Sequence, residues 1–596
     1  MALTKITSDG ITDGTIVSAD INASAAIDGS KISPDFGSQN ITCNRVNTLN
    51  IGTGTNSLNY QTVLGGNALD ANNTGIGINT AIGWKVLTDN TSGHSNVGVG
   101  AFSLTENTTG NQNTALGRNA LANNTGGDSN VAVGAYALDS NTTADNNVAV
   151  GLDALGANTT GASNVAVGAS ALDANTTGSY NTALGQHALG ANQTGQYNTG
   201  VGQGALITNT TANNNTAVGF SALIENTTGT SNVAVGANAL DANTTANNNT
   251  AIGHQALTTV QTGATNTAVG VQALKDCTGA DNTVVGGFAG LSITSGVRNT
   301  GLGYGACDAI TTGSDNIGIG YNGCGAATTG TSNIGIGRNT LNTSNVASHN
   351  IAIGYTALAS TTGGENVAVG REVMVANSSG IYNVGVGSRA LLANTTGYRN
   401  VAVGREALKS NTTAFDNTAV GTVALYSNTT GTANTGVGRQ AINTNTTGSN
   451  NTAVGFNALD DSTTASNNTA VGANALDANT TASYNTGLGT DAFGSLTTGG
   501  FNTAVGRQAG ASCTTAENTV AIGAGAMSNN TCTGTRNTTV GAGSTAHITS
   551  GADNTAIGSL ALHYNTTASN NIAVGRSALQ ENTTGANNTA VGAIAL

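Results

Sequence analysis

Proline, charged residues and aromatic residues are all scarce in this chain of 596 residues. The sequence contains 1 Pro, 8% charged residues and 4% aromatic residues. An ordinary globular protein carries about 25% charged residues, and a disordered chain carries high net charge or much proline, so the composition fits neither class. Gly, in contrast, occurs 85 times. A low-charge chain that is rich in Gly, Asn, Thr, Ala and Val is typical of a repeat protein.

Basic clusters and long apolar segments are also missing. The net charge of −13 is spread over the whole chain, and nucleic-acid binding requires clustered Lys and Arg, so we expect no nucleic-acid partner. No stretch of about 20 apolar residues is present, which predicts no membrane insertion by a helix. The first ten residues lack the apolar centre of a secretion signal.

Cysteine is rare and lacks the spacing of a metal or redox motif. No C-x-x-C occurs, so we expect no zinc site and no cofactor. The six cysteines are Cys43, Cys277, Cys307, Cys324, Cys513 and Cys532.

A repeat of 17 residues fills most of the chain, from about Gln61 to Asn588. Five copies in a row show the period: Asn96-Val-Gly-Val-Gly100, Asn113-Thr-Ala-Leu-Gly117, Asn130-Val-Ala-Val-Gly134, Asn147-Val-Ala-Val-Gly151 and Asn164-Val-Ala-Val-Gly168. The register slips by one residue in a few places, for instance between Asn266 and Asn282. Such a period indicates a solenoid, here with roughly 30 coils.

Positions in the coil are numbered from that Asn, and the same residue types recur at each. Position 3 is Ala or Gly, position 4 is Val, Ile or Leu, position 5 is Gly, and positions 8 and 9 are usually Ala and Leu. Positions 12 to 15 usually read Asn-Thr-Thr-Gly or Asn-Thr-Thr-Ala. We single out eleven structural residues of this repeat: Asn96, Val99, Gly100, Leu104, Asn113, Leu116, Gly117, Asn130, Val133, Gly134 and Leu138.

The repeat predicts an all-β, parallel β-solenoid rather than a helical array. Gly at regular intervals would cost a helix about 1 kcal/mol each, and Val and Thr favour strands. Alternation in a strand places positions 2 and 4 on one face and position 3 on the other. We expect position 4 to line an apolar interior with Leu at position 9. Gly at position 5 would form a corner, and stacked Asn and Thr would form ladders between coils.

Position 3 requires a separate explanation, because a solvent-facing position would accept many polar residues. Its restriction to Ala and Gly indicates a close approach of another backbone, as at the axis of an oligomer. The alternative is a crowded corner inside a single coil. The sequence leaves both interpretations open.

The repeat resembles that of YadA-like heads in trimeric autotransporter adhesins. The copy Asn518-Thr-Val-Ala-Ile-Gly523 is especially close to the family motif. The resemblance covers about nine tenths of the chain and implies a left-handed β-roll in a homotrimer. The 17-residue period is longer than that of the family, and neither a signal peptide nor a coiled coil with a membrane anchor is found.

The first 60 residues differ from the repeat and resemble the N-terminal segments of marine phage tail-fibre proteins. The segments that carry the likeness are Ile11–Asn22 and Ala25–Ile32. We therefore expect two parts, an attachment segment at 1–60 that binds a virion tail or capsid protein, and a solenoid shaft at 61–596. The chain stops in mid-coil at Ala593–Leu596, which leads us to expect a distal tip beyond it. Without a secretion signal, assembly in the host cytoplasm and release by lysis is the simplest route to a virion.

Residues that could carry chemistry each have a simpler structural interpretation. Gly318, Gly320 and Gly323 match the dinucleotide motif G-x-G-x-x-G, but that motif requires a following helix. The six His are expected to be surface residues. Carboxylates at position 10, which could serve glycoside hydrolysis if paired, are interpreted as a solvated face. They are Asp139, Asp173, Asp241, Asp460 and Asp477.

Three further sets depend on the stacking of adjacent coils. Tyr180 and Tyr197 at position 17 should stack their rings, either for packing alone or as a platform for sugars. Cys307 and Cys324 at position 9 should lie in the interior within disulfide range, and we expect buried thiols. Arg at position 6 is interpreted as spaced charge or as a contact for acidic glycans, at Arg118, Arg338, Arg371, Arg405, Arg439, Arg507 and Arg576.

These observations favour a structural phage tail fibre, trimeric and extracellular in action, over an enzyme. Its shaft would hold a host-recognition tip and could contact a host surface glycan. The alternatives are a bacterial surface adhesin or cell-surface filament, and an ice-binding solenoid that uses its Thr rows at positions 13 and 14.

Overall fold

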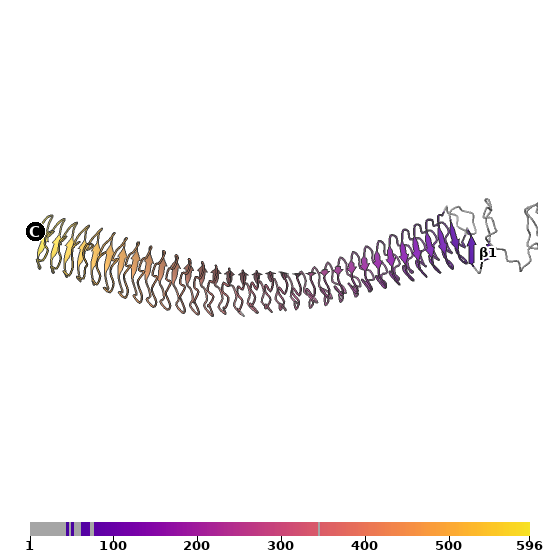
Figure 1. The fold of residues 1–596 in the computed structure, drawn as a ribbon, viewed down its shortest axis with the longest axis horizontal. Coiled ribbons are helices and arrows are strands. Elements are labelled where there is room, and N and C mark those ends of the chain that lie inside the picture. The colour runs from indigo at the N-terminus through magenta and orange to yellow at the C-terminus, as the bar shows by residue number, and fades with distance from the viewer. Residues whose placement is uncertain (1–42, 47–48, 53–60, 72–76, 344–345) are drawn as a thin grey trace, which may run out of the picture.

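The chain forms one long solenoid of parallel strands, as the repeat predicts (Figure 1). In the computed structural model, residues 43–46, 49–52, 61–71, 77–343 and 346–596 are described. They contain strands and turns and no helix, so none of them form a helix able to cross a membrane. The solenoid has about 31 turns of about 17 residues and makes a slender, gently curved rod.

From β3 onward, each turn of the solenoid contributes one short strand, and β1 and β2 precede the first turn. The strands of the N-terminal half are β1 (Cys43–Val46), β2 (Leu49–Gly52), β3 (Thr62–Leu64), β4 (Thr80–Ile82), β5 (Val97–Val99), β6 (Thr114–Leu116), β7 (Val131–Val133), β8 (Val148–Val150), β9 (Val165–Val167), β10 (Thr182–Leu184), β11 (Thr199–Val201), β12 (Thr216–Val218), β13 (Val233–Val235), β14 (Thr250–Ile252), β15 (Thr267–Val269), β16 (Thr283–Val285) and β17 (Thr300–Leu302). Those of the C-terminal half are β18 (Ile317–Ile319), β19 (Ile334–Ile336), β20 (Ile351–Ile353), β21 (Val367–Val369), β22 (Val384–Val386), β23 (Val401–Val403), β24 (Thr418–Val420), β25 (Thr435–Val437), β26 (Thr452–Val454), β27 (Thr469–Val471), β28 (Thr486–Leu488), β29 (Thr503–Val505), β30 (Val520–Ile522), β31 (Thr538–Val540), β32 (Thr555–Ile557), β33 (Ile572–Val574) and β34 (Thr589–Val591).

From β3 onward each strand pairs in parallel with the next strand of the chain. The register stays constant, so that position 2 meets position 2, as where Val131 pairs with Val148. The one-residue slips of the sequence do not disturb it, because Thr267 pairs with Thr283 across a 16-residue coil. The differences in coil length therefore lie in the turns and not in the strands.

The N-terminal edge of the sheet is covered by antiparallel strands. β1 pairs with β2, and β2 pairs antiparallel with β3, where Ile51 faces Leu64. An uncovered parallel edge would present unpaired backbone groups to other chains, so this hairpin caps the first coil. Most of the attachment segment predicted at 1–60 lies outside the described residues.

The interior of the coil is lined by positions 3, 8 and 9, and the prediction for position 4 is wrong. Ala132 at position 3, Ala137 at position 8 and Leu138 at position 9 are fully buried. Val133 at position 4 is only half-buried and faces outward, like Val131. Val99 is likewise half-buried and Leu116 is exposed, whereas Leu104 is fully buried.

Lack of space explains why Ala or Gly occupies position 3. The predicted oligomer axis is not needed, because position 3 is the crowded site inside one coil. Three larger residues occur at position 3, namely Val63, Val284 and Thr539, and Val284 supports this explanation, since its coil has Gly290 in place of the usual Leu at position 9. A Cβ added at Gly290 would lie 3.2 Å from Val284 Cγ1. The larger side chain at position 3 is thus compensated by the missing side chain at position 9, so the interior of the coil stays closely packed.

Two buried ladders of Asn amides connect successive coils, as predicted. At position 1, the Asn130 backbone N–H donates to Asn113 Oδ1 at 2.9 Å, and Asn130 Nδ2 donates to Ala144 O at 2.8 Å. At position 12, Asn141 Nδ2 donates to Asn124 Oδ1 at 2.8 Å. Because each side chain satisfies backbone groups that water cannot reach, the Asn residues hold the turns in register. Asn96 and Asn113 are buried in the same way.

Gly at position 5 makes the predicted corner. Gly100, Gly117 and Gly134 have φ values of 119°, 146° and 139°, a region that residues with a Cβ rarely adopt. Every strand from β3 to β34 is followed directly by Gly. The corner then turns the chain from the sheet into the loop that carries positions 6 to 9.

Candidate functional site

The largest candidate site is the outward face of the sheet, made by positions 2 and 4 of every coil. We call it the sheet face. Each strand from β3 to β34 begins with Thr, Val or Ile and ends with Val, Ile or Leu, without exception. A sheet with one solvated face normally alternates apolar and polar residues, whereas strands buried on both faces do not. The sheet face therefore has the composition of a covered surface.

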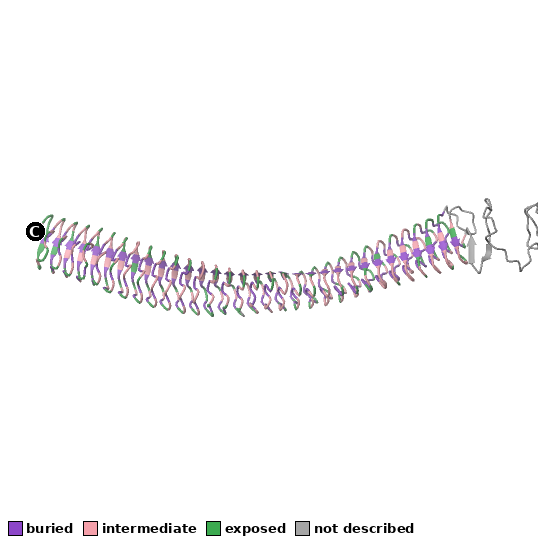
Figure 2. Ribbon diagram, viewed as in Figure 1, coloured by how far each residue is buried: buried purple, intermediate pink, exposed green. Residues whose placement is uncertain are grey.

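The sheet face remains accessible in the single chain. Its leucines are about half exposed, with 48% for Leu116 and Leu184 and 49% for Leu302. In Figure 2 the strands show partly exposed residues beside buried ones along the whole rod. The sheet face runs along about 31 coils that are spaced about 4.8 Å apart, and it is two side chains wide. Its area is therefore on the order of 1,000 Å². Position 4 supplies a continuous apolar row of Val, Ile and Leu along this face, and monomeric proteins rarely expose apolar patches larger than a few hundred Å².

Aromatic residues form stacked pairs between adjacent coils. Tyr180 and Tyr197 stack as predicted, with ring centroids 5.0 Å apart and planes within 1°. Tyr304 and Tyr321 at position 6 stack at 5.7 Å. The stacking shows that these rings pack against each other, while Tyr180 and Tyr197 remain 54% and 55% exposed.

Threonine at position 13 uses its hydroxyl within the fibre. Thr142 Oγ1 donates to Thr159 O at 3.1 Å, and Thr159 Oγ1 donates to Thr176 O at 3.0 Å. A hydroxyl that is bonded to backbone is less available to order ice. This weakens the ice-binding alternative as far as it depends on position 13.

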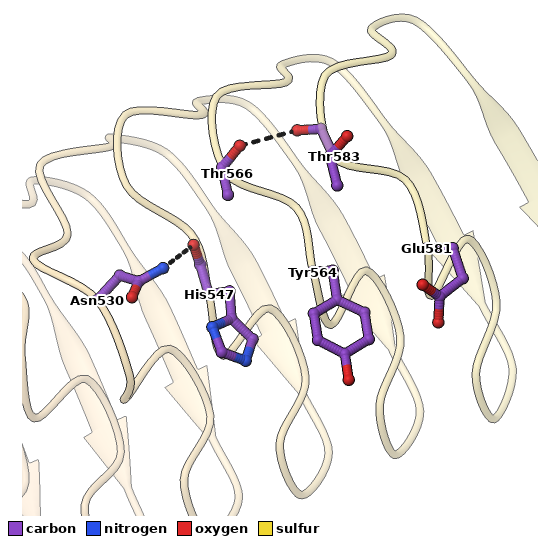
Figure 3. Close-up of a pocket in the computed structure, with 6 residues that line it drawn as sticks. All are labelled: Asn530, His547, Tyr564, Thr566, Glu581 and Thr583. Carbon is purple, nitrogen blue, oxygen red and sulfur yellow. Dashed lines mark hydrogen bonds between the residues drawn. The ribbon is translucent and has the colours of Figure 1, made fainter.

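An open groove lies near the C-terminal end of the solenoid (Figure 3). It has a volume of about 410 Å³. His547, Tyr564 and Glu581 stand in a row on three successive coils, with the His547 and Tyr564 rings 5.2 Å apart. The groove is also lined by Asn530, Thr566 and Thr583.

Two of the polar side chains that line this groove hold adjacent coils together. Asn530 Nδ2 donates to His547 O at 2.6 Å, and Thr566 Oγ1 donates to Thr583 O at 3.1 Å. The His547 ring also meets the His563 ring edge to face at 5.0 Å, a contact that their 16-residue spacing could have predicted. No group of three or more His, Cys, Asp or Glu in the described part of the chain could hold a metal.

The position-10 carboxylates are half-buried rather than fully solvated. Burial raises the pKa of Asp139, and the nearby Asp153 raises it further. The same two causes raise the pKa of Asp173. Burial also raises the pKa of Asp241 and of Asp460. The strongest case is Asp477, whose pKa rises to about 6 through burial and the neighbouring Asp460, Asp461 and Asp491.

Replacing Asp477 with Asn should stabilise the fibre at neutral pH. The folded chain binds the Asp477 proton more tightly than the unfolded chain, so stability falls as the pH rises from about 4 through about 6. After allowance for screening by water, the gain at pH 7 is about 1 kcal/mol. Thermal unfolding at several pH values measures it, and a variant that matches the wild type at pH 7 would contradict it. Asn occupies position 10 naturally at Asn342 and Asn443, so the fold accepts it.

Two pairs of cysteines lie in adjacent coils. Cys307 and Cys324 are buried free thiols in the interior, and the hydrogen bond between them, together with burial, raises the pKa of Cys307. Cys513 and Cys532 are also buried free thiols and pair directly across neighbouring coils. This second pair could not be recognised from the repeat, because its coil has 18 residues and the spacing of the two cysteines is 19.

The glycine motif has no dinucleotide-binding context. Gly318 lies in the middle of β18 and Gly320 forms the next corner, with a φ of 110°. The chain then continues into another turn, so the helix that would bind phosphate is replaced by a solenoid coil.

Comparison of the sequence with family models and with curated proteins finds no match. The resemblance to YadA-like repeats and to phage fibre segments is thus supported by the motifs alone. Function has to be inferred from the geometry of the solenoid and its sheet face.

Proposed function

We propose that this protein is the shaft of a virion fibre, in which three parallel copies pack through their sheet faces. The observation that carries the proposal is the uninterrupted row of Thr, Val, Ile and Leu on the outward side of β3 to β34. A left-handed coil and a homotrimer correspond to the adhesin heads that the repeat resembles. The structural role is proposed in place of a catalytic one.

The size of the sheet face fits association between copies. Its estimated area, on the order of 1,000 Å² per chain, is comparable to the roughly 800 Å² that each partner buries in a stable complex. Three narrow faces around one axis would exclude water from all of them. Because each face is the same in every coil, parallel chains would match along the whole shaft.

The mechanism of such a shaft is mechanical. Hydrogen bonds between coils run along the rod, and each coil is stabilised by its neighbours. Such a rod can hold a host-recognition tip away from a particle that it joins through residues 1–60. Its sides could add weak contacts with host surface glycans, and many weak contacts together give useful avidity.

The main alternative is a bacterial surface adhesin or cell-surface filament with the same shaft. An ice-binding solenoid is a further alternative, since the sheet face is regular and has Thr at many positions 2. The proposal and its alternatives differ in where the protein is found and in whether the sheet face is covered by other chains. Both properties can be measured.

Immunogold electron microscopy with antibodies against the solenoid tests the proposed location. On a culture that produces the protein, we expect gold on thin appendages of released virus particles. Gold confined to the envelope of intact cells would contradict the virion proposal and favour the adhesin. The same antibodies on particles stripped of their tails separate tail attachment from capsid attachment.

A further inference from the structure

Position 6 carries a row of arginines in one part of an otherwise acidic fibre. Seven of the 17 Lys and Arg residues lie between residues 338 and 439, whereas only four of the 30 Asp and Glu residues do. Within this stretch Arg occupies position 6 in every second coil, so that neighbouring arginines are about 9.6 Å apart. We call this set the arginine row, and it comprises Arg338, Arg371, Arg405 and Arg439.

The coils between these arginines carry hydroxyl groups at the same position. Tyr355, Ser388 and Thr422 alternate with the four arginines, so charge and hydroxyl follow each other along the fibre. The arginines and Thr422 are exposed, Tyr355 is 46% exposed, and Ser388 is half-buried. The row lies beyond the Gly corner and is therefore separate from the sheet face.

Each guanidinium in the row is held in place by a neighbour. Arg338 lies 5.6 Å from the ring centroid of Tyr321 and 6.0 Å from that of Tyr355. Arg439 lies 5.5 Å from the centroid of Phe456. Prior ordering of a long side chain reduces the entropy lost when it binds a ligand.

The two central arginines are ordered by carboxylates at position 7. Arg371 pairs with Glu372 at 2.9 Å, and Arg405 pairs with Glu406 at 3.3 Å. Arg389 bridges both carboxylates, at 2.8 Å from Glu372 and 3.7 Å from Glu406.

Positive charge remains in excess after this pairing. Lys409 also contacts Glu406, at 3.3 Å, so that two carboxylates are shared among four cations. Hydrogen bonds from Arg389 and Arg371 lower the pKa of Glu372, which keeps the network ionised at neutral pH. The guanidinium groups of the row keep free N–H donors that point to solvent, since the side chains of Arg371 and Arg405 are 61% and 68% exposed.

We propose that the arginine row binds a linear acidic glycan that lies along the fibre and carries one acidic group on every second sugar. Guanidinium groups recognise carboxylate and sulfate through paired hydrogen bonds, and the hydroxyl positions between them face the neutral sugars. The inference rests on the proposed role as an extracellular fibre. It names the class of glycan and the place where the fibre binds it.

A nucleic acid fits this row less well than a glycan. Its phosphates are closely spaced and require dense cation clusters, whereas Arg occupies position 6 only in every second coil of this row. Glu372 and Glu406 would repel a dense polyanion, as would the net charge of −13 of the chain.

Binding of the full-length chain to three polysaccharides tests the proposal. Hyaluronan has one carboxylate in every two sugars, polygalacturonate has one on every sugar, and dextran has none. We expect hyaluronan to bind most tightly and dextran not at all. Replacing Arg371, Arg405 and Arg439 with Gln should weaken hyaluronan binding about tenfold, the effect of losing three exposed charge pairs.

A matched variant removes the same charge from the same position elsewhere. Arg118, Arg507 and Arg576 also occupy position 6, but each stands alone, so their replacement with Gln should leave hyaluronan binding within about twofold of wild type. Absence of hyaluronan binding, equal losses in both variants, or tighter binding of single-stranded DNA through the same arginines would overturn the proposal. Immunogold labelling of virus particles does not depend on these arginines, so failure of the glycan site and failure of the fibre proposal are distinguishable.

Discussion

Replacing Val218 and Val269 with Asp should separate the three-chain fibre into single chains. Both residues occupy position 4 on the sheet face and are half-buried in the single chain. In the proposed trimer they would become fully buried against neighbouring chains. The variant loses the further burial of two apolar side chains per chain, each worth about 1 kcal/mol because it is already half-buried, and it places uncompensated charges in the core, which costs more.

The matched control changes two other exposed apolar residues in the same two coils. Phe220 and Val271 occupy position 6, where they are 55% and 47% exposed. Their replacement with Asp should leave the trimer intact, because position 6 lies outside the sheet face. Sedimentation velocity at micromolar concentration reports the number of chains, and hydrogen exchange verifies that each variant keeps the solenoid.

Two outcomes would contradict chain association through the sheet face. One is a wild-type protein that sediments as a single chain, which would leave an exposed, regular face and favour ice binding, testable by thermal hysteresis. The other is a sheet-face variant that remains trimeric, which would place the contact between chains elsewhere.

Replacing Gly134 with Ala should disrupt the solenoid locally and strongly. Gly134 has a φ of 139°, and a Cβ there would collide with Gly151 O of the next coil. Strain at this φ and the forced shift of a stacked backbone together cost about 2–4 kcal/mol. Because coils interact only with their neighbours, the loss should appear as faster amide exchange in the coils around residues 117–168, with distant coils unchanged.

A Gly at position 15 provides the control for this substitution. A Cβ at Gly161 would also approach the next coil, at Gly178 O, but Ala occupies the same position naturally at Ala144 and Ala246, so this contact is relieved at little cost. Ala144 and Ala246 lie in the described chain and do not have a positive φ, so position 15 does not require glycine. Equal effects of the Gly134 and Gly161 changes would contradict the special role of the position-5 corner.

The sequence predicts the period, the strands and the ladders of this fold, because these follow from local rules. Val131 and Val133 share a face in any strand, and Gly134 permits a corner that other residues disfavour. Asn113 and Asn130 stack once the period is known. The identity of the inner face was predicted wrongly, because alternation states which residues share a face but not which face is inside.

The volume of the side chains determines which face of each strand points into the coil, and these volumes can be read from the sequence. Leu138 and Ala137 already fill the coil, so only Ala132 fits beside them. Val284 with Gly290 shows the exchange of volume that could have revealed this. The Cys513 and Cys532 pair escaped prediction for another reason, because it depends on a coil of irregular length.

The arrangement of chains about the fibre axis is measured most directly by cryo-electron microscopy of the purified full-length assembly. We predict a three-fold rod in which Ala132 and its equivalents lie inside each coil and Val133 and its equivalents meet across the axis. A rod of one chain, or a trimer whose sheet faces are turned to solvent, would contradict the account.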